Sequence, residues 1–215
     1  MGKLLIERKD INGKVHKIIK SSIVDGPGNR IAIFMQGCNF NCWYCHNPET
    51  IRDNVSFTNY TAKELYLKLE KYFVFVDGIT LSGGEVLLQQ EFVYEFCKLI
   101  KSNTKLSCFI DTNASIEIDD KLFDVIDYFM VDVKVIDENE HFDLTKNDNK
   151  TVIANLRKIN KLKKLYEVRT VLYPGYNHEE TIAFVNTIID KDVTYKKIKF
   201  HSNGVRKEFK KRWEV

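Results

Sequence analysis

Three cysteines lie close together in the sequence at a spacing that suits a metal centre. Cys38, Cys42 and Cys45 are separated by three and then two residues, directly after an apolar run of strand type. Thiolates are soft donors that bind zinc or iron–sulfur clusters. A structural zinc site is closed by four protein ligands. His46 is the nearest candidate for a fourth ligand, but it adjoins Cys45, and adjacent residues rarely bind the same ion. Three ligands without a clear fourth indicate an open coordination position, which is a catalytic arrangement.

The other two cysteines, Cys97 and Cys108, lie far along the chain, and Cys97 is expected in the protein interior. Cys97 lies in an apolar stripe of helical period, and Cys108 lies in a short run of strand type. Free cysteine is among the residues most often buried. We therefore expect neither thiol to take part in the metal site.

Polar residues and glycines follow or interrupt several other apolar runs. They are Ser82-Gly83-Gly84-Glu85, Asp111-Thr112-Asn113, Asp132 and Lys134 after Met130, Arg169, and His201. Each group alone has a structural explanation as a tight turn, a helix cap, a polar strand face or a core ion pair. In a barrel of β/α units, however, chemistry collects at the carboxyl ends of the strands, where these residues are expected.

Six apolar runs are predicted as strands. They cover residues 30–36, 79–81, 106–110, 128–133, 166–172 and 195–200. Between them lie segments of helical period with apolar stripes at 62–69, 92–100, 122–126, 152–159 and 182–189. Strands that alternate with helices predict a parallel sheet. The expected fold class is α/β, a partial (β/α)6 TIM-like barrel of parallel strands, with an open doubly wound sheet as the alternative.

The domain organisation is expected to be simple. No linker, repeat or charge block divides the 215 residues, which predicts a single domain over 1–215 with a core at about 20–202. A short basic tail follows this core and is interpreted as a solvated face or a docking surface. Its cations are Arg206, Lys207, Lys210, Lys211 and Arg212.

Composition excludes several classes of protein. The chain is 44% hydrophobic and 29% charged, which is typical of globular proteins. Its net charge of +3 is lower than is usual for a protein that binds nucleic acid by neutralising phosphates. No apolar run approaches the ~18 residues of a membrane span, and the charged residues 1–10 offer no signal peptide. A cytoplasmic protein without nucleic-acid or membrane partners is expected.

These motifs resemble those of the radical S-adenosylmethionine (SAM) superfamily. The C-x3-C-x2-C spacing after the first predicted strand carries the resemblance. Within the superfamily, the segments Val24–Gly28 and Tyr44–Thr50 are similar to those of the glycyl-radical-enzyme activases. The resemblance implies that the three clustered cysteines hold a [4Fe-4S] cluster and that SAM chelates the fourth iron.

The resemblance also implies roles for the residues at the strand ends. Gly83, Gly84 and Glu85 match the motif that binds the methionyl amino group of SAM. Further SAM contacts are implied for Asp111, Thr112, Asp132, Lys134, Arg169 and His201. A monovalent cation site is implied for Asp111, Thr112, Met130 and Asp132, since oxygen ligands suit a hard cation.

Three further residues enter through the resemblance. Asp25 resembles the residue that faces the substrate glycine in the activases. Ala114 stands where the family usually has glycine after Asp-Thr-Asn, which affects the expected loop conformation. At Gly84 a valine is expected to weaken SAM binding and to spare the cluster, because its side chain would block the close approach of the backbone to SAM.

The implied activity is oxidoreductase chemistry on a partner protein. The chain would cleave SAM reductively and remove a hydrogen atom from a glycine of a glycyl radical enzyme. No cysteine lies between Cys45 and Cys97, so a single cluster is expected, with electrons from flavodoxin or ferredoxin. Two alternatives stay open: the activating subunit of anaerobic ribonucleotide reductase, and a non-enzymatic iron–sulfur electron carrier or zinc module.

Overall fold

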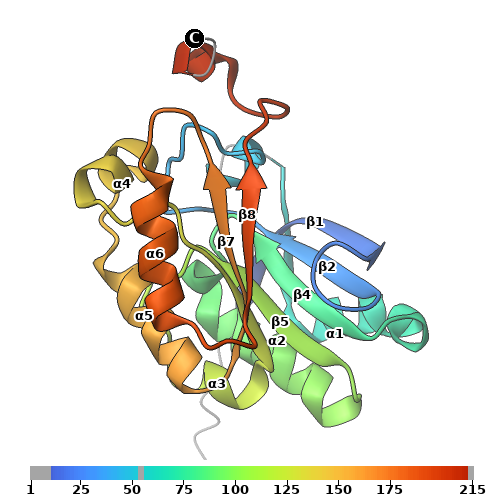
Figure 1. Cartoon of the computed structure of the whole chain (residues 1–215). Helices are drawn as coiled ribbons and strands as arrows, with labels where there is room; N and C mark the ends of the chain where they lie inside the picture. The colour runs from blue at the N-terminus through green and yellow to red at the C-terminus, as the bar shows by residue number, and fades with distance from the viewer. Residues whose placement is uncertain (1–10, 53–55, 213–215) are drawn as a thin grey trace, which may run out of the picture.

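One curved sheet of eight strands forms the centre of the described residues, which are 11–52 and 56–212 of this computed structural model (Figure 1). The strand order is β3-β1-β2-β4-β5-β6-β7-β8. The strands are β1 (Asn12–Ser22), β2 (Arg30–Met35), β3 (Thr58–Thr61), β4 (Gly78–Gly83), β5 (Ser107–Thr112), β6 (Tyr128–Asp132), β7 (Leu165–Leu172) and β8 (Thr194–Lys199).

The six predicted strands are confirmed as β2 and β4 to β8, all paired in parallel. They lie side by side in the order in which they occur in the chain. A doubly wound sheet would reverse its strand order at a switch point, so this alternative is wrong. The sheet does not close on itself, because β3 and β8 are its two ends. The observed α/β fold is therefore the expected partial barrel.

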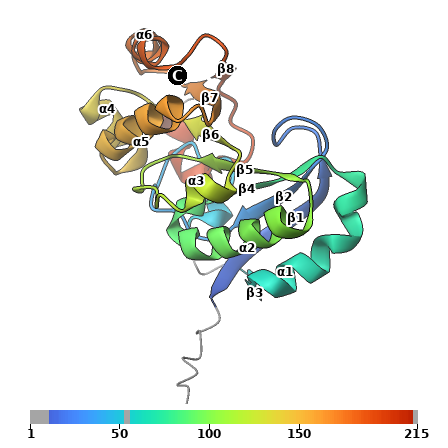
Figure 2. The same cartoon turned by 90° about the horizontal axis from the view of Figure 1, so that it is seen from below.

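The helices lie on the convex side of the sheet, so that its concave side faces away from them (Figures 1 and 2). They are α1 (Ala62–Leu69), α2 (Gln90–Asn103), α3 (Leu122–Val125), α4 (Glu138–Thr145), α5 (Lys150–Lys161) and α6 (His178–Ile188). Five of them were predicted. The predicted capping box of α1 is confirmed, because the Thr61 side chain accepts from the backbone N–H of Glu64 and the Glu64 carboxylate accepts from that of Thr61.

Two strands and one α-helix were not predicted from the sequence, nor were the short 3-10 helices. Strands β1 and β3 extend the sheet beyond β2 in antiparallel pairs. Most residues of both strands are only partly buried or exposed, so their apolar pattern is weak. Helix α4 buries only His141, Leu144 and Thr145, which leaves it without a clear apolar stripe. Apolar patterns as short as these cannot be distinguished from the sequence of a loop.

Strand β8 forms the other end of the sheet and is largely exposed on both faces. Its sequence, TYKKIK, contains three lysines. The neighbouring β7 is partly buried and pairs with β8 from Glu167 opposite Thr194 to Leu172 opposite Lys199.

The hydrophobic core lies between the sheet and its helices. Cys97 on α2 is fully buried there, as predicted, and so is Cys108 on β5. Within the described part of the chain, no helix has the length and apolar character needed to cross a membrane. Residues 1–10, on which the prediction of no signal peptide rests, lie outside the described residues, and the predicted domain limits stay a prediction.

Candidate functional site

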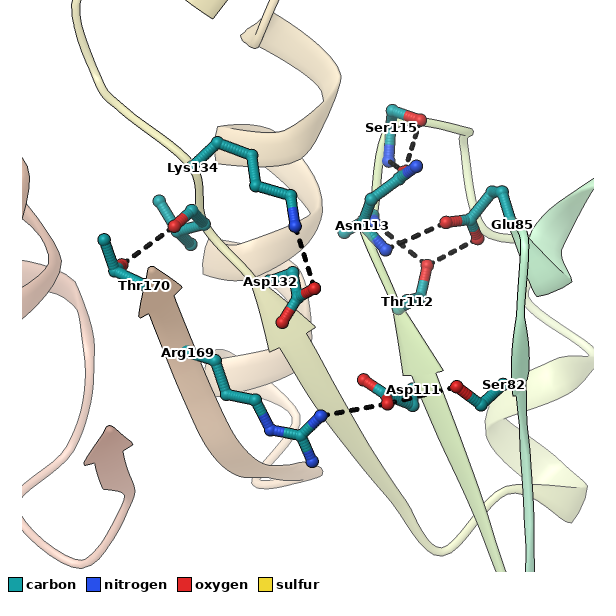
Figure 3. A network of polar contacts seen from close by, with 12 residues as sticks. Ser82, Glu85, Asp111, Thr112, Asn113, Ser115, Asp132, Lys134, Arg169 and Thr170 are labelled. Carbon is teal, nitrogen blue, oxygen red and sulfur yellow. Dashed lines mark hydrogen bonds and ion pairs between the residues drawn. The ribbon is translucent and has the colours of Figure 1, made fainter. Parts of the chain in front are cut away.

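A cavity of about 240 Å³ opens at the carboxyl edge of the parallel strands. Its walls come from the loop after β2 and from the ends of β4, β5, β6 and β7. Figure 3 shows side chains of these four strands pointing toward one another. Sheet register brings these ends level, with Met35 opposite Gly83 and Asp132 opposite Arg169. The predicted site residues that line it are Cys38, Cys42, Cys45, Gly83, Gly84, Asp111, Thr112, Asp132, Lys134 and Arg169.

The loop that carries the three cysteines is held from several sides. Its start is fixed by the backbone N–H of Gly37, which donates to the carbonyl of Thr50 at 2.8 Å. Its middle is fixed to the end of α4, since the N–H of Asn41 donates to the carbonyl of Thr145 at 2.9 Å. The Asn39 amide also donates to the Ser115 hydroxyl at 2.9 Å. These bonds orient the cysteines before any ligand is bound.

The three thiols are suited to a cluster that displaces their protons. Burial raises the pKa of Cys42 to about 11, although the nearby Lys134 cation opposes this shift. Burial also raises the pKa values of Cys38 and Cys45. The thiols are therefore protonated at neutral pH, and binding of a metal centre must release protons.

The arrangement of the cysteines fits a cluster ligated at several irons. None of the three is in a disulfide, and all face the same cavity. Within residues 11–52 and 56–212, no three Cys, His, Asp or Glu side chains converge closely enough to hold a single metal ion. Ligands of different irons in one cluster need no such convergence, so the donor set is compatible with a [4Fe-4S] group.

The glycine pair after β4 has a structural reason that the sequence did not show. Gly83 has a φ of +116°, which favours glycine, and a Cβ there would lie 2.3 Å from the backbone nitrogen of Met35. A Cβ on Gly84 would lie only 1.9 Å from the carbonyl oxygen of Gly37, the residue before Cys38. The glycines thus allow the turn to pack directly on the start of the cysteine loop. This geometry argues against the expectation that Gly84→Val spares the cluster.

Glu85 is fully buried and does not line the cavity, and its carboxylate points toward Thr112 and Asn113 (Figure 3). Its carboxylate accepts hydrogen bonds from the Thr112 hydroxyl at 2.5 Å, from the Asn113 N–H at 2.8 Å and from the Leu87 N–H at 2.9 Å. Burial raises the pKa of Glu85 to about 7 despite these bonds. Its carboxylate therefore ties the loop after β4 to the loop after β5.

Two carboxylates and two cations line the far wall of the cavity. Arg169 Nη1 donates to Asp111 at 2.9 Å and Arg169 Nε donates to Glu167 at 2.5 Å, so the arginine is paired as a core ion pair requires. Lys134 Nζ pairs with Asp132 at 2.8 Å. Ser82 also donates to Asp111 at 3.1 Å.

Burial and pairing set the charges of this wall. Burial acts to raise the pKa of Asp132, but Lys134 and Arg169 outweigh it and the pKa is lowered. Burial also acts to lower the pKa values of Lys134 and Arg169, but their carboxylate partners raise both. Burial raises the pKa of Asp111, although Arg169 opposes this shift. The wall thus presents the paired charges of Asp132, Lys134 and Arg169, which suit a zwitterion.

Besides Glu85, three more of the predicted residues lie outside the cavity lining. Met130 is buried, and its sulfur accepts from Arg169 Nη2 at 3.2 Å. His201 is exposed, and its ring stacks at 4.2 Å on that of His46, which does line the cavity. The carbonyl of Asp25 accepts from Thr80, three residues before Gly83 on β4, so Asp25 lies below the cavity.

Some lining residues were not predicted as site residues, although motifs contained several of them. Ser82, Asn113, Tyr44 and His46 all line the cavity. Ser82 and Asn113 directly follow or end predicted strands, so their position was the available signal. Ala114 beside them is fully buried with a φ of +54°, a conformation that explains why glycine is usual there.

Comparisons with known proteins agree with this geometry. Residues 32–188 match the model of the radical SAM superfamily. The pyruvate formate-lyase-activating enzyme of Staphylococcus epidermidis is 32% identical over 213 residues, which cover 92% of this chain and 84% of that protein. The enzyme of the same name from Staphylococcus aureus is 31% identical over 214 residues, with the same coverage.

Two solved structures share the fold. QueE from Escherichia coli has a TM-score of 0.61 at 14% identity, over 87% of this chain and 84% of QueE. SuiB from Streptococcus suis, bound to S-adenosylmethionine, has a TM-score of 0.63 at 16% identity, over 80% of this chain and 41% of SuiB. At these identities the likeness concerns the fold alone.

Proposed function

The chain belongs to the radical SAM superfamily, and from this premise we propose that it activates a glycyl radical enzyme by removing a hydrogen atom from one of its glycines. Membership implies a [4Fe-4S] cluster and SAM. The finer assignment is supported by relatives named pyruvate formate-lyase-activating enzyme, which align with 92% of the chain. The reaction would be an oxidoreductase reaction in an anaerobic cytoplasm, with one electron supplied by flavodoxin or ferredoxin.

The observation that carries the proposal is that three free thiols and two fixed ion pairs line one cavity. When bound, the cluster would supply the single electron needed to cleave the C5′–S bond of SAM to methionine and a 5′-deoxyadenosyl group, which would accept the glycine hydrogen atom. In this proposal Cys38, Cys42 and Cys45 hold the cluster. The protein orients the reactants and excludes water, while the cofactor carries the radical chemistry.

The charged wall would hold the methionyl end of SAM. Its amino group would lie against the Gly83–Gly84 turn and its carboxylate against Lys134 or Arg169. Both cations are anchored by carboxylates, so their side chains lose little freedom when SAM binds. A monovalent cation at Asp111, Thr112, Met130 and Asp132 stays part of the proposal, although both carboxylates already have cationic partners.

The open concave side supports a macromolecular substrate. The described helices lie on the convex side of the sheet (Figure 2). Asp25 lies on the loop between β1 and β2, and its carbonyl is bonded by Thr80, below the cavity. A partner loop could enter from this side, and Asp25 is proposed to position it. Selectivity for one glycine must come from such positioning, because the radical has no inherent preference for glycine.

The test uses the reconstituted, reduced protein with SAM and a glycyl radical enzyme encoded nearby. The expected result is a glycyl doublet in the EPR spectrum, with 5′-deoxyadenosine formed in step. Asp25→Ala should still cleave SAM slowly but activate the partner poorly. The exposed control Asp192→Ala should cleave SAM and activate the partner as the wild type does. Consumption of a small metabolite without a protein radical would refute the activase assignment, and a radical on ribonucleotide reductase would favour that alternative.

A further inference from the structure

The positive charge of the chain is concentrated in one segment near its end. Residues 206–212 contain five cations and one carboxylate, a net charge of +4, whereas the whole chain carries +3. The remainder of the chain is therefore net negative by one charge. Most of this segment is the short helix η4 (Lys207–Arg212), which lies beyond the upper ends of β7 and β8 in Figure 1.

This segment is fixed against the cysteine loop. Arg206 Nη2 donates to the backbone carbonyl of Cys42 at 3.0 Å and to that of Asn41 at 3.4 Å. Just before it, a Cβ on Gly204 would lie 2.9 Å from the carbonyl oxygen of His46, so this turn packs directly on the same loop. The basic segment is thus the outer cover of the loop whose inner side faces the cavity.

The side chain of Trp43 packs between the basic segment and the cysteine loop. Trp43 follows Cys42 directly and is only 2% exposed. Its indole N–H donates to the Tyr176 hydroxyl at 3.2 Å, and the Arg212 guanidinium lies 5.8 Å from its ring centre. Arg212 itself is held by Asp143 at 2.7 Å. Packed side chains, without intervening solvent, therefore connect the outer surface of η4 to Cys42, one of the proposed cluster ligands.

Charge on this surface is available to a partner. Lys207 and Lys211 are exposed, while Arg206 and Arg212 are used to hold the segment in place. Among the residues of this segment whose side chains the structure describes, 206–209 and 211–212, none lines the cavity. A protein bound on η4 would therefore leave both the cavity and the concave side of the sheet accessible.

We propose that the outer surface of η4 is the docking site of an acidic one-electron carrier protein. This inference rests on the proposed function, since it assumes a cluster at the three cysteines. The carrier is oxidised by one electron, and the cluster is reduced by it. SAM and the partner loop would occupy the cavity and the concave side, so the electron must enter from the outer side of the cysteine loop. Complementary charge accelerates association of such carriers and makes it sensitive to salt.

The test compares two reductants of the reconstituted protein. Reduced flavodoxin serves as the acidic carrier, and photoreduced 5-deazariboflavin serves as a small reductant that needs no docking surface. In Lys207→Glu/Lys211→Glu, reduction of the cluster by flavodoxin at low salt should be about tenfold slower or more. Reduction by deazariboflavin should be unchanged. Biolayer interferometry should show the same loss in the binding of oxidised flavodoxin.

Two controls separate charge from other effects. Lys63→Glu/Lys98→Glu changes the net charge equally on the exposed faces of α1 and α2 and should leave both rates unchanged. Lys207→Arg/Lys211→Arg keeps the charge and should retain fast reduction by flavodoxin. Equal flavodoxin rates in the wild type and the Glu variant, or an equal loss with deazariboflavin, would overturn the docking site. If deazariboflavin reduces no cluster in the wild type, the proposed function itself fails.

Discussion

Single side chains separate the cysteines that should bind iron from those that should not. Each of Cys38→Ala, Cys42→Ala and Cys45→Ala should lose the cluster, because an open site has no spare ligand. Cys97→Ala should keep it and lose about 1–2 kcal/mol of stability, since this thiol is fully buried in the core. Iron and sulfide per chain after anaerobic reconstitution, with a urea unfolding curve, measure both effects. Full iron content in Cys42→Ala would contradict the assignment.

Glu85 should make the stability of the metal-free protein depend on pH. Its pKa is raised to about 7 in the folded state, against an ordinary value of 4.5. The folded state therefore binds the proton more tightly, so this contribution to stability is complete below pH 4.5 and is lost as the pH rises through 7. A shift of this size corresponds to about 3 kcal/mol.

The comparison with Glu85→Gln isolates this effect from other titrating groups. Urea unfolding of both proteins at pH 5 and pH 8 should show a larger loss of stability in the wild type. Equal pH dependence in the two proteins would contradict the raised pKa. Thr112 and Asn113, which Glu85 bonds, both line the cavity, so a weaker affinity for SAM is expected as well.

At this scale the sequence indicated which residues gather but not where each side chain points. The cysteines, Asp132, Lys134 and Arg169 line the cavity as expected. Glu85 was expected beside a ligand and lies in the interior, because a motif gives the residue type and not the rotamer. His201 was expected to contact SAM but does not line the cavity. Its ring stacks on that of His46, which does line the cavity.

At the scale of elements, the turn after β4 should be coupled to the cysteine loop. Gly84→Ala should lower iron content as well as SAM binding, because its Cβ would clash with the carbonyl of Gly37. Gly175→Ala is the matched control: its φ is +86°, but its Cβ would meet no atom within 4 Å. It should cost about 1 kcal/mol from backbone strain and leave the cluster intact. Normal iron content in Gly84→Ala would show that the loop adjusts without loss of its ligands.

The success of prediction differed among the elements for a physical reason. Strands β2 and β4 are almost completely buried, and after Arg30 the sequence of β2 is a continuous apolar run. Strands β1 and β3 lie toward one end of the sheet, where partial exposure removes that signal. The contact between Gly84 and Gly37 joins residues 47 positions apart, and no local pattern reports it.

For the whole molecule, the order of parallel strands could be predicted because each helix returns the chain to the next position on the same side of the sheet. How far the barrel stays open could not be predicted from the sequence, because this depends on where the last strand lies. The anchoring of the tail was also invisible in the sequence, where five cations suggested a solvated face. Its contact with Cys42 requires the fold to bring together residues 164 positions apart.

An incomplete barrel has two unpaired ends, and an exposed strand end invites another chain to add to it. The three lysines of β8 would place like charges opposite each other if two copies met at this edge. Lys197→Thr/Lys199→Thr should therefore promote self-association, seen by light scattering at rising protein concentration and low salt, while Lys197→Arg/Lys199→Arg should not. Monodisperse scattering from the threonine variant would assign solubility to another part of the surface. An open barrel, which the proposed macromolecular substrate would require, is thus compatible with a monodisperse protein, because the lysines of β8 oppose pairing of two copies at this edge.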